Sequence, residues 1–407
     1  MSRSSDAAAP GYSRLFRNRE FRALWFGSAL GTVSTSMAGL ALGLLVHAQT
    51  GSALLTALVV FGPSLAQLFG ASSLMSAADT VQPRILLATT AGAIAAAFAA
   101  QAALDLAPVG RLAIVVCASF ALSLASGARW GLLADVVSAD GYALARSAMN
   151  VSVGVMQVVG FALGGLLVAW LSPAPIFWFA VVTSLAGALV SWFGIGKHPS
   201  RRAGRPGLGV TWAANGLLLS RHSTRWLLLA LCVPNGLVAG CEALFVSYSP
   251  SSAALFFMAG AAGMLAGDIL MGRILTGHSR RIVAEWLRLL LPVPFLVFLC
   301  NPSVAVAAVM VAIGSIGYAA SLGQQELLVA LTPRELTGQL LGAESSARVA
   351  FQGLAAALAG ALAEFVSTGL AIGLLSLTSV AVSLALIPGL RRAAASVPLV
   401  RPVYASH

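Results

Sequence analysis

Residues 149–205 read MNVSVGVMQVVGFALGGLLVAWLSPAPIFWFAVVTSLAGALVSWFGIGKHPSRRAGR, and the pattern in this stretch recurs along the chain. Two apolar runs, Met149–Leu171 and Ile176–Gly196, are separated by Ser172–Pro175, a joint without a basic residue. The joint after the second run begins at Lys197 and contains three arginines by residue 205. Because a helix needs about 20 apolar residues to cross a bilayer, this stretch predicts one crossing out and one crossing back.

The same alternation runs through all 407 residues. Hydrophobic residues make up 58% and charged residues 9% of the chain, whereas a soluble domain needs about a quarter of its residues charged. Helices are expected because lipid cannot satisfy exposed backbone polar groups. We therefore predict an all-α membrane protein with twelve transmembrane helices, at Phe21–His47, Ser52–Ala78, Arg84–Leu104, Leu112–Ala134, Met149–Leu171, Ile176–Gly196, Trp226–Ser247, Ala253–Leu275, Ile282–Leu299, Ser303–Leu328, Ala347–Val366 and Leu370–Leu390.

Basic residues are concentrated in every second joint, and this asymmetry predicts the orientation of the chain. Arginines surround the start of the first span and follow the last span, whereas joints such as Ser247–Ser252 have none; Arg111 departs from the pattern. Since cytoplasmic joints carry the excess of Lys and Arg, both termini are expected in the cytoplasm. The first twenty residues lack an apolar core, so we expect no cleaved signal peptide. The net charge of +11 does not indicate nucleic-acid binding, because the basic residues lie in joints and form no single polar face.

One long polar stretch, at 197–225, is rich in Arg, Gly and Pro and lies between the sixth and seventh spans. We interpret it as a cytoplasmic linker between two six-helix bundles, at 1–196 and 226–407, the second with a short cytoplasmic tail. A weak internal repeat supports this division, since Ala125–Arg146 and Ala320–Gln339 share a small-residue helix end, a Leu-Leu pair and a turn. Repeats of six spans recur in secondary transporters, so the two bundles are expected to be pseudo-symmetric.

Two short segments resemble bacterial exporters of the major facilitator superfamily. Leu15–Trp25 reads LFRNREFRALW, which is similar to the segment that leads into the first span of many such exporters. Met75–Arg84 reads MSAADTVQPR, at the joint where the superfamily has a signature close to G-x-L-A-D-R-x-G-R-R. Asp79 and Arg84 match this signature, and Met75 replaces its leading glycine.

The fifth span contains a further pattern. Antiporters of the superfamily often carry G-P-x-x-G-G there, and this chain keeps the glycines as Gly160, Gly164 and Gly165 but has Phe161 in place of the proline. Glycines at this spacing allow two helices to approach closely. The resemblance implies the major facilitator fold and a monomeric exporter of the bacterial cytoplasmic membrane, which moves a drug, siderophore or natural product outward as protons enter. The implied partners are a small-molecule substrate, protons and membrane lipid, with no nucleic acid.

An ionisable residue inside a membrane span is a functional candidate by default. Glu242 follows Trp226 by 16 residues in the seventh span, which places it roughly 24 Å into the membrane at about 1.5 Å per residue. We interpret Glu242 as a residue that exchanges a proton or recognises a cation. The alternative is a carboxylate hydrated at the outer interface.

Charged residues near span ends could hold the two bundles together in one conformation and release them in the other. The alternatives are static pairing and interfacial placement of the charged head. The candidates for this gating role are Asp79, Arg84, Arg129 and Asp135 in the first half, and Asp268 and Arg273 in the second.

Other chemistries receive little support from the sequence. Asn150 and Gln157, two turns apart in the fifth span, are candidates for lining a substrate cavity, or for hydrogen bonds between helices. The four cysteines have no metal-ligand spacing, and no phosphate-binding loop pattern is present, so we expect no metal, no cofactor and no enzymatic activity. The primary hypothesis is proton-coupled efflux of a small or medium amphipathic compound. Import or lipid flipping on the same fold, or a membrane sensor or enzyme, remain alternatives.

Overall fold

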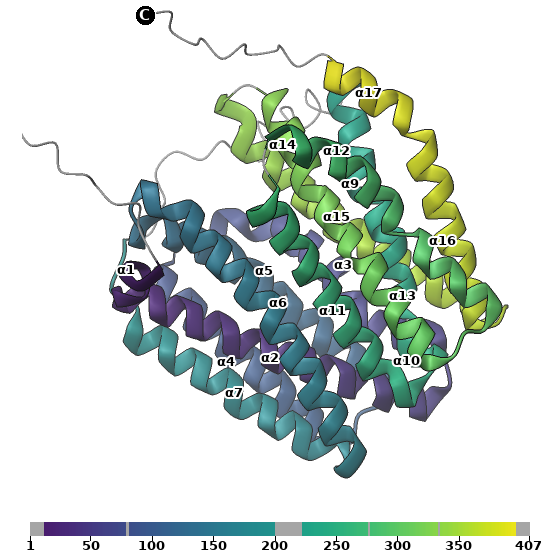
Figure 1. The fold of residues 1–407 in the computed structure, drawn as a ribbon. Coiled ribbons are helices and arrows are strands. Elements are labelled where there is room, and N and C mark those ends of the chain that lie inside the picture. The colour runs from purple at the N-terminus through teal and green to yellow at the C-terminus, as the bar shows by residue number, and fades with distance from the viewer. Residues whose placement is uncertain (1–11, 79–80, 200–221, 276, 333, 396–407) are drawn as a thin grey trace, which may run out of the picture.

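The computed structural model describes residues 12–78, 81–199, 222–275, 277–332 and 334–395. These residues form helices joined by short turns, and no strand occurs in this part of the chain (Figure 1). The N-terminal half contains α1 (Tyr12–Arg17), α2 (Arg19–Thr50), α3 (Ala53–Ala78), α4 (Pro83–Ala103), α5 (Pro108–Val136), α6 (Ala139–Trp170) and α7 (Pro173–Gly194).

Helix boundaries in this half follow local chemistry. Proline occupies the first turn of α4, α5 and α7, where its missing N–H is not needed by the helix. The Asn18 side chain accepts hydrogen bonds from the amides of Glu20 and Phe21 at the start of α2, at 2.9 and 3.2 Å. Gly51 ends that helix in the left-handed conformation, with a φ of 64°, which glycine adopts without steric cost.

The C-terminal half is more interrupted. Its elements are α9 (His222–Ala243), α10 (Phe245–Tyr248), η1 (Pro250–Ser252), α11 (Ala253–Ile269), the π-helical turn η2 (Leu270–Ile274), α12 (Gly277–Leu290), η3 (Val293–Cys300), α13 (Val304–Ile316), η4 (Gly317–Ala319), α14 (Ala320–Ala330), α15 (Arg334–Ala363), α16 (Thr368–Ala385) and α17 (Ile387–Ala395). Five predicted spans of this half, the seventh to the tenth and the twelfth, are therefore built from more than one helical piece.

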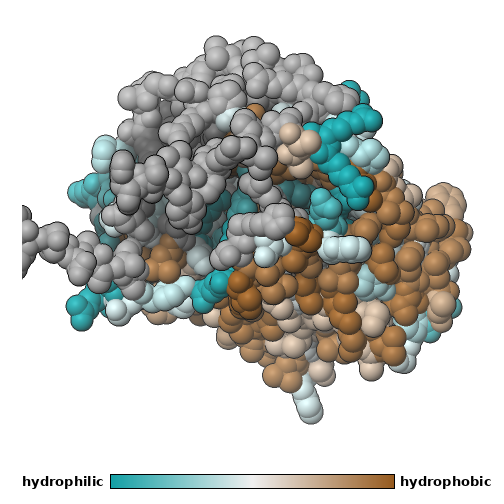
Figure 2. Space-filling view, turned by 45° about the horizontal axis from the view of Figure 1, so that its top comes forward, coloured by the Kyte–Doolittle hydropathy of each residue, from teal (hydrophilic) through white to brown (hydrophobic). Residues whose placement is uncertain are grey.

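The all-α membrane architecture predicted from sequence is confirmed. Within the described residues, eleven stretches are long and apolar enough to cross a bilayer, and the described apolar part of α3, Ala53–Ala66, is shorter. Large apolar side chains such as Trp170, Trp178 and Phe193 are exposed on the outside of the helices. In Figure 2 hydrophobic residues cover a broad area at the lower right of the view, with hydrophilic residues above this area and to its left. Lipid is the solvent that suits this surface. The domain boundaries at 197–225 remain a prediction, because residues 200–221 lie outside the described part.

Arg111, the exception to the charge pattern, has a local structural explanation. Its guanidinium group donates to the carbonyl oxygens of Leu106 and Gln101 and to the Gln101 side-chain oxygen, at 3.0 to 3.2 Å. The Gln101 amide donates back to the Arg111 carbonyl oxygen. Arg111 is 5% exposed, and its hydrogen bonds join the end of α4 to the start of α5. Its charge therefore has a structural role and does not indicate which side of the membrane the joint faces.

The two halves meet along α3 with α15 and along α6 with α11. Gly360 of α15 lies so close to α3 that an added Cβ would be 2.7 Å from the Leu54 Cα atom. At the same end of the bundle, which the charge pattern predicts to face outward, Glu364 follows the last residue of α15. It accepts a hydrogen bond from the Ser52 hydroxyl at 2.7 Å and one from the Leu54 amide at 3.0 Å. A carboxylate of one half thus caps a helix of the other.

This contact predicts a pH-dependent closure of the outer end. The hydrogen bonds from Leu54 and Ser52 hold the pKa of Glu364 below its ordinary value, so the ionised form stabilises the closed contact, and that stabilisation is lost as the pH falls through the lowered pKa. Glu364→Gln should open the outer end at neutral pH. A cysteine replacing Ala57, in a variant without the native cysteines, should react about two- to fivefold faster with an impermeant thiol reagent, because an exposed charged contact contributes ~0.5–1 kcal/mol.

Asp105→Asn is the control for this experiment, because Asp105 is exposed at the same end of the bundle in another joint. An Ala57→Cys reaction rate that is the same with and without Glu364→Gln would show that this carboxylate does not hold the outer end closed.

Candidate functional site

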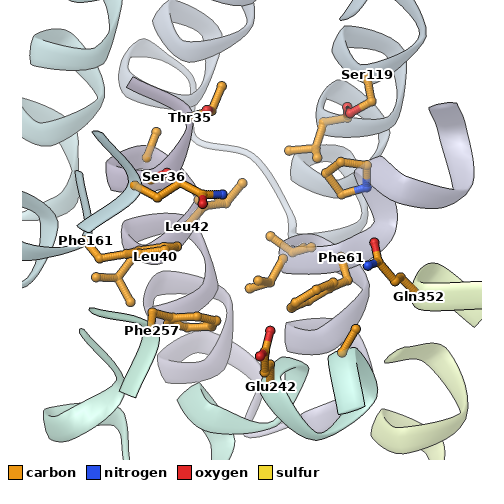
Figure 3. Close-up of a pocket in the computed structure, with 18 of the residues that line it drawn as sticks. Thr35, Ser36, Leu40, Leu42, Phe61, Ser119, Phe161, Glu242, Phe257 and Gln352 are labelled. Carbon is orange, nitrogen blue, oxygen red and sulfur yellow. Dashed lines mark hydrogen bonds between the residues drawn. The ribbon is translucent and has the colours of Figure 1, made fainter. Parts of the chain in front are cut away.

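A cavity of about 570 Å³ lies between the two halves and is lined by α2 to α6 on one side and by α9, α10, α11, η4, α14 and α15 on the other. Its volume is in the range of cavities that hold drug-sized ligands. Figure 3 shows the Glu242 carboxyl group pointing into this cavity, with Phe61 and Phe257 drawn on either side. The cavity is the candidate substrate site.

The wall from the N-terminal half is mostly apolar. Leu40, Leu42 and Phe61 contribute hydrophobic surface to it. The hydroxyl groups of Thr35 and Ser119 are occupied by carbonyl oxygens of their own helices, at 2.9 and 2.7 Å. These residues therefore offer few free polar groups to a ligand.

The wall from the C-terminal half carries the charge. Among the described residues, the three charged ones that line the cavity, Glu242, Asp268 and Arg348, belong to this half. Arg348 is paired with Glu344 at 2.9 Å, and Glu344 also accepts a hydrogen bond from Gln325 at 2.9 Å. The cavity therefore has an apolar wall and an acidic wall.

Glu242 lies at a break in its span. The helix α9 ends one residue later at Ala243, Leu244 forms a turn, and α10 begins at Phe245. The Glu242 side chain is half-buried; its Oε1 atom is inaccessible and has no hydrogen-bond partner, while the Tyr318 side chain lies beside the carboxyl group. A carboxyl group placed this way, at a break in a helix that lines a cavity, is suited to take up and release a proton.

Two further spans of the C-terminal half are irregular next to polar residues of the cavity wall. Asp268 is followed one residue later by the end of α11 and then by the π-helical turn η2, and Tyr318 lies in the 3₁₀ turn η4. Such irregular turns within helices recur at functional sites. In the described residues, three interruptions of the C-terminal half thus coincide with three polar residues of the cavity wall.

Sequence reasoning missed part of this site. Asn235 and Gln352 line the cavity and are joined by a hydrogen bond of 2.7 Å between α9 and α15. Neither residue, nor Tyr318, was singled out, although an isolated amide or phenol within an apolar span is a signal that could have found them. Of the two predicted lining residues, Gln157 lies in the cavity wall, whereas Asn150 is exposed on α6 and is not part of the lining.

The predicted glycines fall at close helix contacts. A Cβ added to Gly160 would lie 2.8 Å from the Ser36 Cβ atom, and one on Gly164 would lie 3.2 Å from the Met37 Cα atom, both on α2. Gly165 faces the other half, where its Cβ would overlap with Ala254 of α11.

Phe161, which replaces the proline of the G-P-x-x-G-G pattern, also contacts the other half. The Phe161 ring stacks on Phe257 of α11, with a centroid distance of 5.0 Å.

The predicted gating charges are placed as follows. Arg84 lies over the Trp192 ring, 4.7 Å from its centroid. Arg129 donates to the Ser28 hydroxyl at 3.1 Å, within the same half. The remaining four residues are Asp79, which lies outside the described residues, Asp135, which is exposed near the end of α5, Asp268, which lines the cavity, and Arg273, which is hydrogen-bonded to Tyr12.

Asp268 and Arg273 form no ion pair with each other in the described structure. The gating role of these charged residues stays a prediction.

A sequence model described as Major Facilitator Superfamily matches residues 24–348. The chain belongs to the Major Facilitator Superfamily. This membership confirms the predicted fold class and the family part of the resemblance, while the exporter subtype stays a prediction.

Solved transporters share this fold. A POT family transporter in complex with a thioalcohol-conjugated peptide aligns with a TM-score of 0.75 at 11% identity, over 92% of this chain and 96% of that chain. A bacterial homolog of the human lysosomal transporter Spinster, inward-facing and unoccupied, aligns with a TM-score of 0.65 at 14% identity over 93% and 96%. The nucleoside transporter NupG, solved as a point mutant, aligns at 0.71 and 11% identity over 91% and 99%. No curated protein sequence matches the chain. The family and these neighbours are transporters, which confirms that the chain is not an enzyme.

The close contact of Gly165 with Ala254 yields a stability prediction. Gly165→Ala should lower the midpoint of thermal unfolding of the purified protein, because the new methyl group forces α6 away from α11 at a cost of about 1–3 kcal/mol. Gly92→Ala is the matched control, since nothing lies within 4 Å of a Cβ at that position. Equal midpoints for the two variants would contradict the close approach of the halves at Gly165.

Proposed function

We propose that this protein is a secondary active transporter that exports a small or medium amphipathic compound in exchange for protons. The observation that carries the proposal is the cavity between the halves, with an apolar wall on one side and Glu242 at a helix break on the other. An amphipathic compound can satisfy both walls at once. The proposed location is the bacterial cytoplasmic membrane, with a monomer whose two termini lie in the cytoplasm.

Proton coupling is proposed because few groups near Glu242, other than a proton, could neutralise its carboxylate charge. Its Oε1 atom has no hydrogen-bond partner, and the cation in the cavity wall, Arg348, is already paired with Glu344. An uncompensated charge is costly within a membrane, so proton binding at Glu242 stabilises the empty cavity. Release of that proton, when the cavity faces the cytoplasm, would leave a carboxylate ready for the next cycle.

Alternating access follows from the way in which the halves meet. Packed contacts join α3 with α15 and α6 with α11, and these pairs can act as the surfaces on which two bundles, at 1–196 and 226–407, rock against each other. We propose that charged residues of the first bundle hold the predicted cytoplasmic end closed in the alternate state. These residues are Asp79, Arg84, Arg129 and Asp135. In the described structure Arg129 contacts only its own half.

The central test uses Glu242→Gln, which keeps the shape of the side chain and removes its proton exchange. A panel of fluorescent dyes that are cationic, zwitterionic or neutral first identifies one that the wild type exports from proteoliposomes under an inward proton gradient. Glu242→Gln should reduce gradient-driven export of that dye at least about tenfold. Dye exchange without a gradient should persist.

Glu285→Gln, an exposed carboxylate of α12 outside the cavity, is the control for expression and folding. Gradient-driven export that continues unchanged in Glu242→Gln would contradict the proposed coupling. Dye movement into the vesicle lumen against the proposed direction would favour import, and transbilayer movement of labelled lipid alone would favour flipping.

A second prediction concerns the gating charges. Arg129→Ala should slow turnover of the exported dye while changing its binding affinity less than about twofold, because Arg129 does not line the cavity. Arg22→Ala, an exposed arginine at the same end, is the control. Turnover equal to that of the wild type would remove Arg129 from the gating mechanism.

A further inference from the structure

The two carboxylates of the cavity wall lie in different environments. Glu242 is half-buried and lies beside the Tyr318 side chain. Asp268 is exposed to the cavity and forms no hydrogen bond or ion pair within the described residues. When two titratable groups share one site but differ in environment, the difference assigns them different roles.

Two arginines are the nearest candidates for pairing with Asp268, one nearby in sequence and one in the cavity wall, and both already have other partners. Arg348 is paired with Glu344 at 2.9 Å. Arg273 is hydrogen-bonded to the Tyr12 hydroxyl and lies over the Tyr12 ring, 5.4 Å from its centroid. The structure therefore leaves the Asp268 carboxylate accessible and without a cationic partner of its own. A ligand could supply that partner.

The face of α11 that leads to Asp268 is apolar. Phe257, Ala261, Met264 and Asp268 all line the cavity and follow one another at intervals of three or four residues, which places them on one face of the helix. The eleven helical steps from Phe257 to Asp268 span roughly 16 Å at about 1.5 Å per residue.

One end of this face carries the aromatic stack with Phe161, and Met264 in its middle is an adaptable apolar contact. The face is therefore an elongated apolar track that ends at a carboxylate.

We propose that the cargo is an elongated amphiphile with a single cationic head, and that Asp268 receives this head while the apolar body lies along Phe257, Ala261 and Met264. Asp268 is then the specificity-determining residue of the cavity, and Glu242 is left free to carry the proton. The role of Glu242 in this assignment rests on the proposed function. The binding of the cationic head at Asp268 is argued separately, from the geometry of α11.

The test compares two synthetic ligands of one shape and different charge. The first is a phenylalkyl trimethylammonium ion, whose charge does not depend on pH, and the second is its tert-butyl isostere, in which carbon replaces the nitrogen. Binding of each to the purified full-length protein is measured by calorimetry without a proton gradient. The wild type should bind the cation at least about tenfold more tightly than the isostere, which corresponds to about 1.4 kcal/mol.

Asp268→Asn should remove most of this preference while changing the affinity for the isostere less than about twofold, so the isostere reports whether the variant still folds around the cavity. Glu242→Gln and Asp105→Asn should keep the preference. The proposal is overturned by equal affinities of the wild type for the two ligands, by no measurable binding of the cation, or by Asp268→Asn weakening both ligands alike. It is equally overturned if Glu242→Gln, rather than Asp268→Asn, removes the preference.

The two proposals fail separately. Loss of the cation preference in these binding measurements leaves proton-driven export by the wild type intact. Conversely, Glu242→Gln with undiminished gradient-driven export would contradict the coupling mechanism and leave the assignment of Asp268 standing.

Discussion

A charge surrounded by lipid needs a partner, and this constraint organises the structure. The chain meets it locally for some of its charges: Arg111 is held by Gln101 and by carbonyl oxygens, and Arg348 is held by Glu344. Burying a paired charge is tolerable, whereas burying a lone one is costly. Against this background Glu242 and Asp268 stand out, because both face the cavity and neither is paired with a cation among the described residues. The groups without such partners are therefore where ligand and proton chemistry is expected.

The two halves differ in the chemistry of the walls that they give the cavity. In the N-terminal half, α2 and α4 to α6 run through the cavity region without a described break and contribute mostly apolar surface. In the C-terminal half, α9, α11 and α13 are interrupted next to Glu242, Asp268 and Tyr318. Breaks in a span expose backbone polar groups that only a cavity or a neighbouring helix can satisfy. One half thus provides a smooth surface, and the other provides the binding and exchange groups.

The spans could be predicted from the sequence because hydropathy and joint charge are local properties, and lipid enforces them on each helix separately. The site was predicted only in part. Glu242 was found because any ionisable residue in a span is conspicuous, but the hydrogen bond between Asn235 and Gln352 joins residues 117 positions apart and has no local signature. Asn150 and Gln157 look alike in sequence and lie two turns apart in α6, and only their positions along the helix relative to the cavity separate the exposed residue from the one in the cavity wall. The break at Leu244 was missed because nothing in the local apolar sequence marks it.

The central claim is that two bundles rock about one cavity, so that its ends open in alternation. Electron spin resonance between paired labels tests this claim directly. One pair, at Leu104 and Val304, spans the outer end, and the other, at Arg146 and Ile274, spans the inner end; all four residues are exposed. The account predicts that, on acidification or ligand addition, the two distance distributions shift in opposite directions. Shifts in the same direction, or a shift at one end alone, would contradict it.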